Sequence, residues 1–190
     1  QHHILEALME SGFGSSESTI GDDEHIDQYV DLEKVYQVVD ADSSQTVAIL
    51  DVNKGKNLVI QGPPGTGKSQ TITNLIAEAI GNGKKILFVA EKMAALEVVK
   101  RNLDKIGLGD ACLELHSHKS NKKAVLDELR RITQLGKPHL LHNGQDLEVL
   151  KKNRDRLNRY CEAVNTPIGE SQVTPYYAFG ILLNLKRHFQ

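Results

Sequence analysis

The feature that most constrains this chain is a glycine-rich loop between two regular segments. Residues 62–69 read Gly-Pro-Pro-Gly-Thr-Gly-Lys-Ser and match the whole pattern G-x-x-x-x-G-K-[ST]. The apolar run 58–60 precedes the loop, and a segment with helical periodicity follows it. A strand, such a loop and a helix in this order place backbone N–H groups and the helix dipole around phosphate groups. The sequence therefore predicts a site for a nucleoside triphosphate, ATP with Mg²⁺.

Each residue type in this phosphate loop (residues 62–69) has a chemical reason. Gly65 and Gly67 permit backbone angles and close approaches that a side chain would block. Lys68 is the candidate catalytic residue because its ammonium reaches the β and γ phosphate oxygens. The hydroxyl of Ser69 is a hard oxygen ligand of the kind that Mg²⁺ prefers. The predicted nucleotide contacts here are Gly62, Pro63, Pro64, Gly65, Thr66, Gly67, Lys68, Ser69 and Gln70.

Two further apolar runs follow the loop, at residues 86–90 and 111–115. Between the runs lie two segments with apolar residues at helical spacing, 72–80 and 96–106. Continuous apolar runs are typical of parallel strands covered on both faces. Alternation of strand and helix predicts an α/β fold with a mainly parallel sheet.

Beyond residue 120 the pattern is helical only. One helix is marked by Val125, Leu129 and Ile132, and a long helix is expected from about Gly144 to Asn165. Gly136-Lys137-Pro138 separates the two, so we expect the chain to reverse there and form an antiparallel helical arm. The apolar seam of the long helix contains Arg154, which we expect at the edge with its charged end in water.

Composition limits the class of protein. Hydrophobic residues are 39% and charged residues 25% of the 190 residues, as in globular proteins. No apolar run is long enough to cross a bilayer, and two cysteines suggest a reducing, cytoplasmic setting. Residues 1–44 carry a net charge of −10 and the rest of the chain +8. A basic body is compatible with a nucleic-acid partner, or with an unevenly charged solvated surface. The first residue is not Met, and we interpret the chain as a piece of a longer protein.

Residues 38–137 closely resemble superfamily 1 DNA helicases of the bacterial branch related to the Upf-type and Dna-type proteins. The matching stretches are residues 40–45, 61–69, 86–99 and 113–119. The resemblance implies that Gln45, seventeen residues before Gly62, reads adenine, because a side-chain amide both donates and accepts. It also implies that residues 90–94 lie against single-stranded nucleic acid, with Lys92 near a phosphate. Glu91-Lys92 departs from the Pro-Thr or Pro-Ser pair of many members, which puts these individual contacts in doubt.

The resemblance gives a domain plan: an acidic leader (1–36), an incomplete RecA-like P-loop core (37–120) and a helical arm or insertion (121–190). The exposed face of the long helix adds candidate phosphate contacts at Lys151, Lys152, Arg156 and Arg159, with an ordinary solvated face as the alternative. His116 and His118, near Cys112, suit a loop better than a metal site because four convergent ligands are not evident.

Hydrolysis needs an acidic residue after an apolar strand, to hold Mg²⁺ and orient water. Asp127-Glu128 lies in a helical pattern, so we expect this chain to bind nucleotide but hydrolyse it poorly. The interpretation is the ATP-binding part of a helicase that moves along or unwinds single-stranded or duplex nucleic acid, with DNA favoured. Two alternatives stay open: an AAA-type ATPase or nucleotide switch without unwinding activity, and a protein-interaction module on a nucleotide-binding base. The sequence leaves the oligomeric state open.

Overall fold

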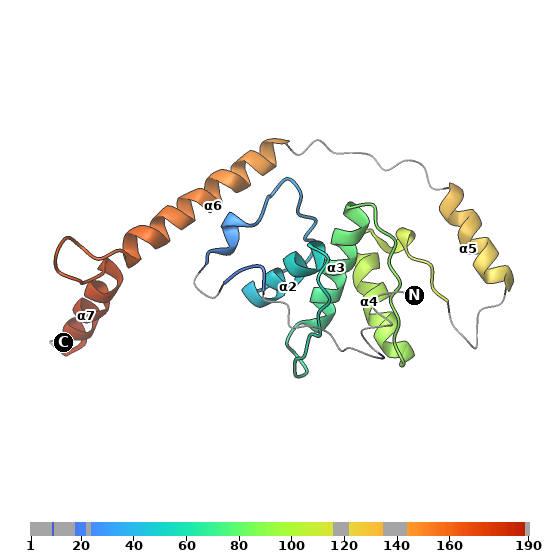
Figure 1. The fold of residues 1–190 in the computed structure, drawn as a ribbon, viewed down its shortest axis with the longest axis horizontal. Coiled ribbons are helices and arrows are strands. Elements are labelled where there is room, and N and C mark those ends of the chain that lie inside the picture. Colours follow the sequence, from blue (N-terminus) through green and yellow to red (C-terminus); the bar gives the residue numbers. More distant parts are fainter. Residues whose placement is uncertain (1–8, 10–17, 22–23, 116–121, 135–143, 189–190) are drawn as a thin grey trace. The chain divides into compact units, whose positions relative to one another are not determined.

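The computed structural model describes residue 9 and residues 18–21, 24–115, 122–134 and 144–188. In these residues the regular elements are α-helices and short 3-10 helices (Figure 1). The chain divides into two compact units, residues 1–138 and residues 139–190. None of the helices in the described part of the chain is long and apolar enough to cross a membrane.

The predicted α/β fold with a parallel sheet is wrong for the described residues. The runs 58–60, 86–90 and 112–115 form no strand. Among the described backbone hydrogen bonds outside helices, none joins two of these runs; each links residues close in sequence. Val59 and Leu87 are both 86% exposed, whereas central strands would be buried. Apolar, β-prone sequence supplies only a propensity, and a strand also needs a neighbour for its N–H and C=O groups.

Three helices form the body of the first unit: α2 (Ser43–Asn53), α3 (Lys68–Gly81) and α4 (Met93–Lys105). The apolar spacing predicted α3 and α4 in these places. Glycines just after the ends of α3 and α4, Gly83 and Gly107, have φ of 67° and 77°. A residue in this left-handed conformation ends an α-helix and favours glycine.

The core of this unit lies between α3 and α4. Ile76 of α3 packs with Val99 and Leu103 of α4, and all three are buried. Phe88, from the second apolar run, packs against this cluster. Its neighbours Leu87 and Val89 are 86% and 76% exposed. The run therefore alternates between inward and outward residues, as an extended chain does, although it has no strand partner.

The segment before α2 lies on the first unit and contains a 3-10 helix, η2 (Ile26–Gln28). The buried carboxylate of Asp51 accepts hydrogen bonds from Thr19 N at 2.9 Å and Ser18 Oγ at 3.4 Å, and pairs with Lys56 Nζ at 3.1 Å. Burial alone would raise the pKa of Asp51, but the hydrogen bonds from Thr19 and the charge of Lys56 hold it below its usual value. Asp51 therefore anchors residues 18–20 to α2.

Helix α5 (Lys122–Gln134) follows the 3-10 helix η3 (Gly109–Ala111). Arg131 of α5 bonds to Asp110 of η3 and, at 2.7 Å, to Glu128 one turn earlier. Asp127 pairs with Arg130 at 3.5 Å. The prediction that Asp127-Glu128 lies in a helix, and does not follow a strand, is confirmed.

The second unit consists of α6 (Gly144–Asn165) and α7 (Pro175–His188), which pack against each other. The limits of α6 are those predicted, and at 1.5 Å per residue it is about 33 Å long. Helix α7 begins at Pro175, where a missing N–H has no cost, and Thr174 Oγ1 accepts from Tyr177 N at 3.2 Å. Arg154 bonds to Asp155 at 3.2 Å, and its side chain is 26% exposed. Leu150 and Leu157 of the expected seam are 51% and 62% exposed, so the position of Arg154 at the edge of that seam stays a prediction. The expected partner of α6, helix α5, belongs to the other unit, so antiparallel pairing of α5 with α6 stays a prediction.

Candidate functional site

The phosphate loop runs directly into the N-terminus of α3. Gly65 and Gly67 have φ of 89° and 74°, a region that favours glycine, and Gly67 is the N-cap of α3. Thr66 Oγ1 donates to the carbonyl oxygen of Pro63 at 2.8 Å and closes the loop on itself. A Cβ at Gly62 would lie 2.5 Å from Thr66 Oγ1, so a side chain there would displace this hydroxyl from Pro63. The backbone angles favour glycine at positions 65 and 67, and the Thr66 hydroxyl favours it at position 62.

Lys68 is the first residue of α3, and its side chain folds back over the loop. Its ammonium donates to the carbonyl oxygens of Gly62 and, at 2.7 Å, of Pro63. These two bonds hold a positive charge at the helix N-terminus, where the unpaired N–H groups of the first turn also attract anions. An ammonium has three hydrogens, so Lys68 is equipped to contact a phosphate oxygen beside the loop.

The second residue of α3, Ser69, is partly buried, and its carbonyl oxygen accepts from Thr73 Oγ1 at 2.8 Å. Its hydroxyl has the chemistry of a Mg²⁺ ligand next to the phosphate loop. One serine is not a metal site, and the described residues contain no cluster of His, Cys, Asp or Glu able to hold a metal ion. The residues fit a Mg²⁺ that arrives with the triphosphate and keeps water and phosphate oxygens as its other ligands.

Gln45 lies against the phosphate loop. It is the third residue of α2 and forms a capping box with Asp42: its backbone N donates to Asp42 Oδ1 at 2.9 Å, and its Oε1 accepts from Asp42 N at 3.2 Å. Its Nε2 donates to the carbonyl oxygen of Thr66 at 3.1 Å. A Cβ at Gly67 would lie 2.4 Å from Gln45 Nε2 and 2.7 Å from Gln70 Oε1. The structure thus brings both predicted glutamines to the loop.

Two polar residues on the buried side of α3 were not predicted from the sequence. Asn74 is 0% exposed and Glu78 2% exposed, and both bond to the segment before α2. The available signal was their spacing of four residues next to the apolar stripe, which places them on one helix face.

The candidate nucleic-acid contacts fall in both units. Lys92 is the exposed N-cap of α4, with Glu91 exposed beside it. Lys152, Arg156 and Arg159 are exposed on α6. Their spacing of four and three places these three on one helix face. Lys151, also on α6, is partly buried.

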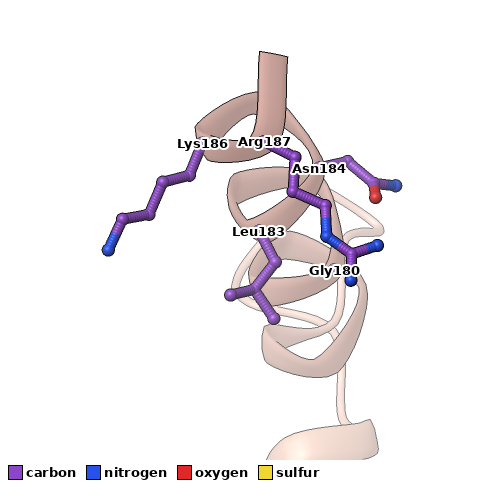
Figure 2. Close-up of a pocket in the computed structure, with 5 residues that line it drawn as sticks. All are labelled: Gly180, Leu183, Asn184, Lys186 and Arg187. Carbon is purple, nitrogen blue, oxygen red and sulfur yellow. The ribbon is translucent and has the colours of Figure 1, made fainter. Parts of the chain in front are cut away.

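Two hollows lie in the second unit, away from the phosphate loop in the sequence. One, of about 460 Å³, is lined by Gly180, Leu183, Asn184, Lys186 and Arg187 of α7 (Figure 2). The other, of about 560 Å³, lies between α6 and α7 and is lined by aromatic and apolar residues including Tyr160 and Tyr177. Neither contains a residue of the phosphate loop. Neither offers the glycine-rich backbone that binds phosphates closely.

A family model described as an AAA domain (AAA_11) matches residues 40–171 of the chain. The chain belongs to this family. The match begins just before Gln45, includes the whole phosphate loop and extends through α6. The match confirms the resemblance to superfamily 1 helicases. AAA-type helicase domains in general use ATP and Mg²⁺.

Two curated relatives resemble this AAA domain over a shorter stretch. The uncharacterized ATP-dependent helicase MG140 of Mycoplasma genitalium is 45% identical over 73 residues, which are 38% of this chain and 6% of that protein. Its homolog in Mycoplasma pneumoniae is 43% identical over 72 residues, again 38% of this chain and 6% of that protein. The matched part is thus a small fraction of the length of these relatives. No solved structure matches the chain significantly.

His116 and His118 lie outside the described residues. Cys112 and Cys161 are both free thiols. Burial raises the pKa of Cys112, whose Sγ is 3.5 Å from the carbonyl oxygen of Leu108. A raised pKa disfavours the thiolate, which is the form that binds metals or acts as a nucleophile.

Proposed function

We propose that this AAA domain binds Mg-ATP at the phosphate loop, with Gln45 contacting the adenine, Lys68 the β and γ phosphates, and Ser69 the Mg²⁺. The observation that carries the proposal is the convergence of three groups on one loop. The Lys68 ammonium, the positive end of α3 and the Gln45 amide all lie at residues 62–69. A triphosphate with an adenine at one end is the ligand that uses all three.

In the intact protein we assign this binding to an ATP-driven helicase that moves along or unwinds DNA. Support comes from the family match and from the mycoplasma relatives, which are named as ATP-dependent helicases. Two free thiols fit a cytoplasmic location. The exposed bases on α6, and Lys92 at the start of α4, are the proposed contacts to DNA phosphates. They carry no base-specific chemistry and would act through charge alone.

Binding and hydrolysis are separate tasks in this proposal. Hydrolysis requires a carboxylate that orients water beside the γ phosphate. Asp127 and Glu128 are paired with arginines on α5 and are not assigned this role. Lys68 is the catalytic candidate because it touches the transferred phosphate, and we expect hydrolysis by this chain alone to be slow.

Calorimetry of the chain with ATP, in the presence and absence of Mg²⁺, tests the proposal. We expect saturable binding with one nucleotide per chain and tighter binding with Mg²⁺. GTP at the same concentrations is the matched control for base recognition. Absence of saturable Mg-ATP binding would contradict the proposal. Equal affinities for ATP and GTP would support the phosphate site and contradict the role of Gln45 in recognising adenine.

A further inference from the structure

The backbone of residues 36–39 is held by two buried side chains of α3. Asn74 Oδ1 accepts from Val38 N at 3.0 Å and from Val39 N at 3.1 Å, and Asn74 Nδ2 donates to Val39 O at 3.0 Å. Glu78 Oε1 accepts from Tyr36 N at 2.7 Å. These four bonds satisfy backbone groups of a segment that has no regular structure of its own.

Two further contacts belong to the same site on α3. We call Asn74, Glu78 and Gly81, the α3 residues that contact the segment before α2, the seat. Glu78 Oε2 accepts from Asn53 Nδ2, at the end of α2, at 3.3 Å. The ring of Tyr36 lies over Gly81. A Cβ at position 81 would be only 2.4 Å from the ring atoms Cγ and Cδ2. The seat therefore binds the segment before α2 and the last residue of α2 with the same carboxylate.

The seat and the phosphate-binding end are parts of one helix. Lys68 and Ser69 begin α3, and Asn74 and Glu78 follow within the next three turns. Three residues after Val39, Asp42 caps α2 and accepts the backbone N–H of Gln45. Since a helix is rigid over this length, it fixes the seated segment, and so Gln45, at a set distance from the phosphate loop.

We propose that Asn74 and Glu78 are positioning residues that hold Gln45 in register with the phosphate loop and thereby set the preference for adenine. The proposal rests on the proposed Mg-ATP site, and it adds specificity-determining residues further along α3 than its phosphate-binding end. Neither residue touches the nucleotide. Their loss should affect recognition of the base and spare recognition of the phosphates.

The test measures the affinities of the whole chain for Mg-ATP and Mg-GTP by calorimetry. Asn74→Leu removes three hydrogen bonds to the segment at similar volume. Gly81→Ala leaves every hydrogen bond partner in place, adds a better helix former, and displaces the Tyr36 ring. Thr73→Val is the control: it is equally buried on α3 but bonds only to Ser69 O within the helix. Thermal melting of each variant confirms that it is folded.

We expect both Asn74→Leu and Gly81→Ala to lower the ATP-to-GTP affinity ratio about fivefold, the effect of roughly one hydrogen bond. Affinity for Mg-GTP should stay unchanged, and Thr73→Val should keep the wild-type ratio. An unchanged ratio in both variants, or equal losses for both nucleotides, would overturn the positioning role while the nucleotide site stands. A wild-type chain that binds both nucleotides equally overturns it together with base reading by Gln45, and one that binds neither overturns the proposed function itself.

Discussion

Gln45 Nε2 donates a hydrogen bond to the carbonyl oxygen of Thr66 at 3.1 Å, which joins α2 to the phosphate loop. The other end of the same amide, Oε1, accepts from Asp42 N at 3.2 Å. The side chain is thus fixed at both ends beside the loop. A residue expected to read a base also links the helix cap to the backbone of the phosphate site.

This link sharpens the prediction for Gln45. Gln45→Ala removes the whole amide, including its bonds to Asp42 and Thr66, so it should narrow the preference for Mg-ATP over Mg-GTP. Gln45→Glu keeps an acceptor for Asp42 N and loses the donor to Thr66, so it separates the helix cap from the loop contact. Calorimetric titration of the three proteins with both nucleotides measures the effect. Identical base preference in all three would limit Gln45 to a structural role.

Asp51 should make the stability of the first unit depend on pH. Its pKa is lower in the folded chain than the ordinary value of 3.8, so its ionised form stabilises the fold. This stabilisation is present above about pH 4 and is lost as the pH falls through the lowered pKa. Thermal melting of wild type and Asp51→Asn from pH 7 to pH 3 measures it.

We expect Asp51→Asn to melt at a lower temperature at pH 7, and the difference to shrink below about pH 4. Asp127→Asn on α5 is the control, since Asp127 is exposed and its pair with Arg130 spans 3.5 Å. A difference between wild type and Asp51→Asn that is constant from pH 7 to pH 3 would show that the carboxylate charge does not stabilise the anchor of residues 18–20.

The basic face of α6 gives a prediction about salt. Neutralising Lys151, Lys152, Arg156 and Arg159 together should weaken binding of single-stranded DNA to a similar extent for unrelated sequences. It should also flatten the dependence of affinity on salt, because fewer counterions are released. Fluorescence anisotropy with labelled oligonucleotides at several salt concentrations checks both points. Neutralising Lys84 and Lys85, which are exposed between α3 and α4, is the control. It removes two positive charges from outside α6, half as many as the α6 variant. An unchanged salt slope would remove α6 from the DNA surface.

Most of the local structure was predictable from the sequence, and the tertiary pairing was not. The apolar spacing around Ile76 and around Val99 and Leu103 predicted α3 and α4, because helix hydrogen bonds are internal to the segment. Their contact was not predicted. Val59 and Leu87 were predicted to lie in buried strands and are exposed. A strand depends on partners far along the chain, which local pattern does not specify.

The candidate site divides in the same way. The loop pattern identified Lys68 and Ser69 because phosphate binding requires these residue types at fixed positions in one short segment. The resemblance identified Gln45. Asn74 and Glu78 were not predicted, because in a sequence a buried polar residue cannot be distinguished from an exposed one. The distinction needs their hydrogen-bond partners, here the backbone of residues 36–39.

The central claim, that Lys68 and the phosphate loop bind Mg-ATP, is tested most directly by calorimetry of wild type and Lys68→Ala. Losing a charged partner of a phosphate in a desolvated site costs about 2–5 kcal/mol, so we predict an affinity at least about 30-fold lower for the variant. Lys84→Ala is the matched control and should bind as wild type does. Equal affinity of wild type and Lys68→Ala for Mg-ATP would contradict the account.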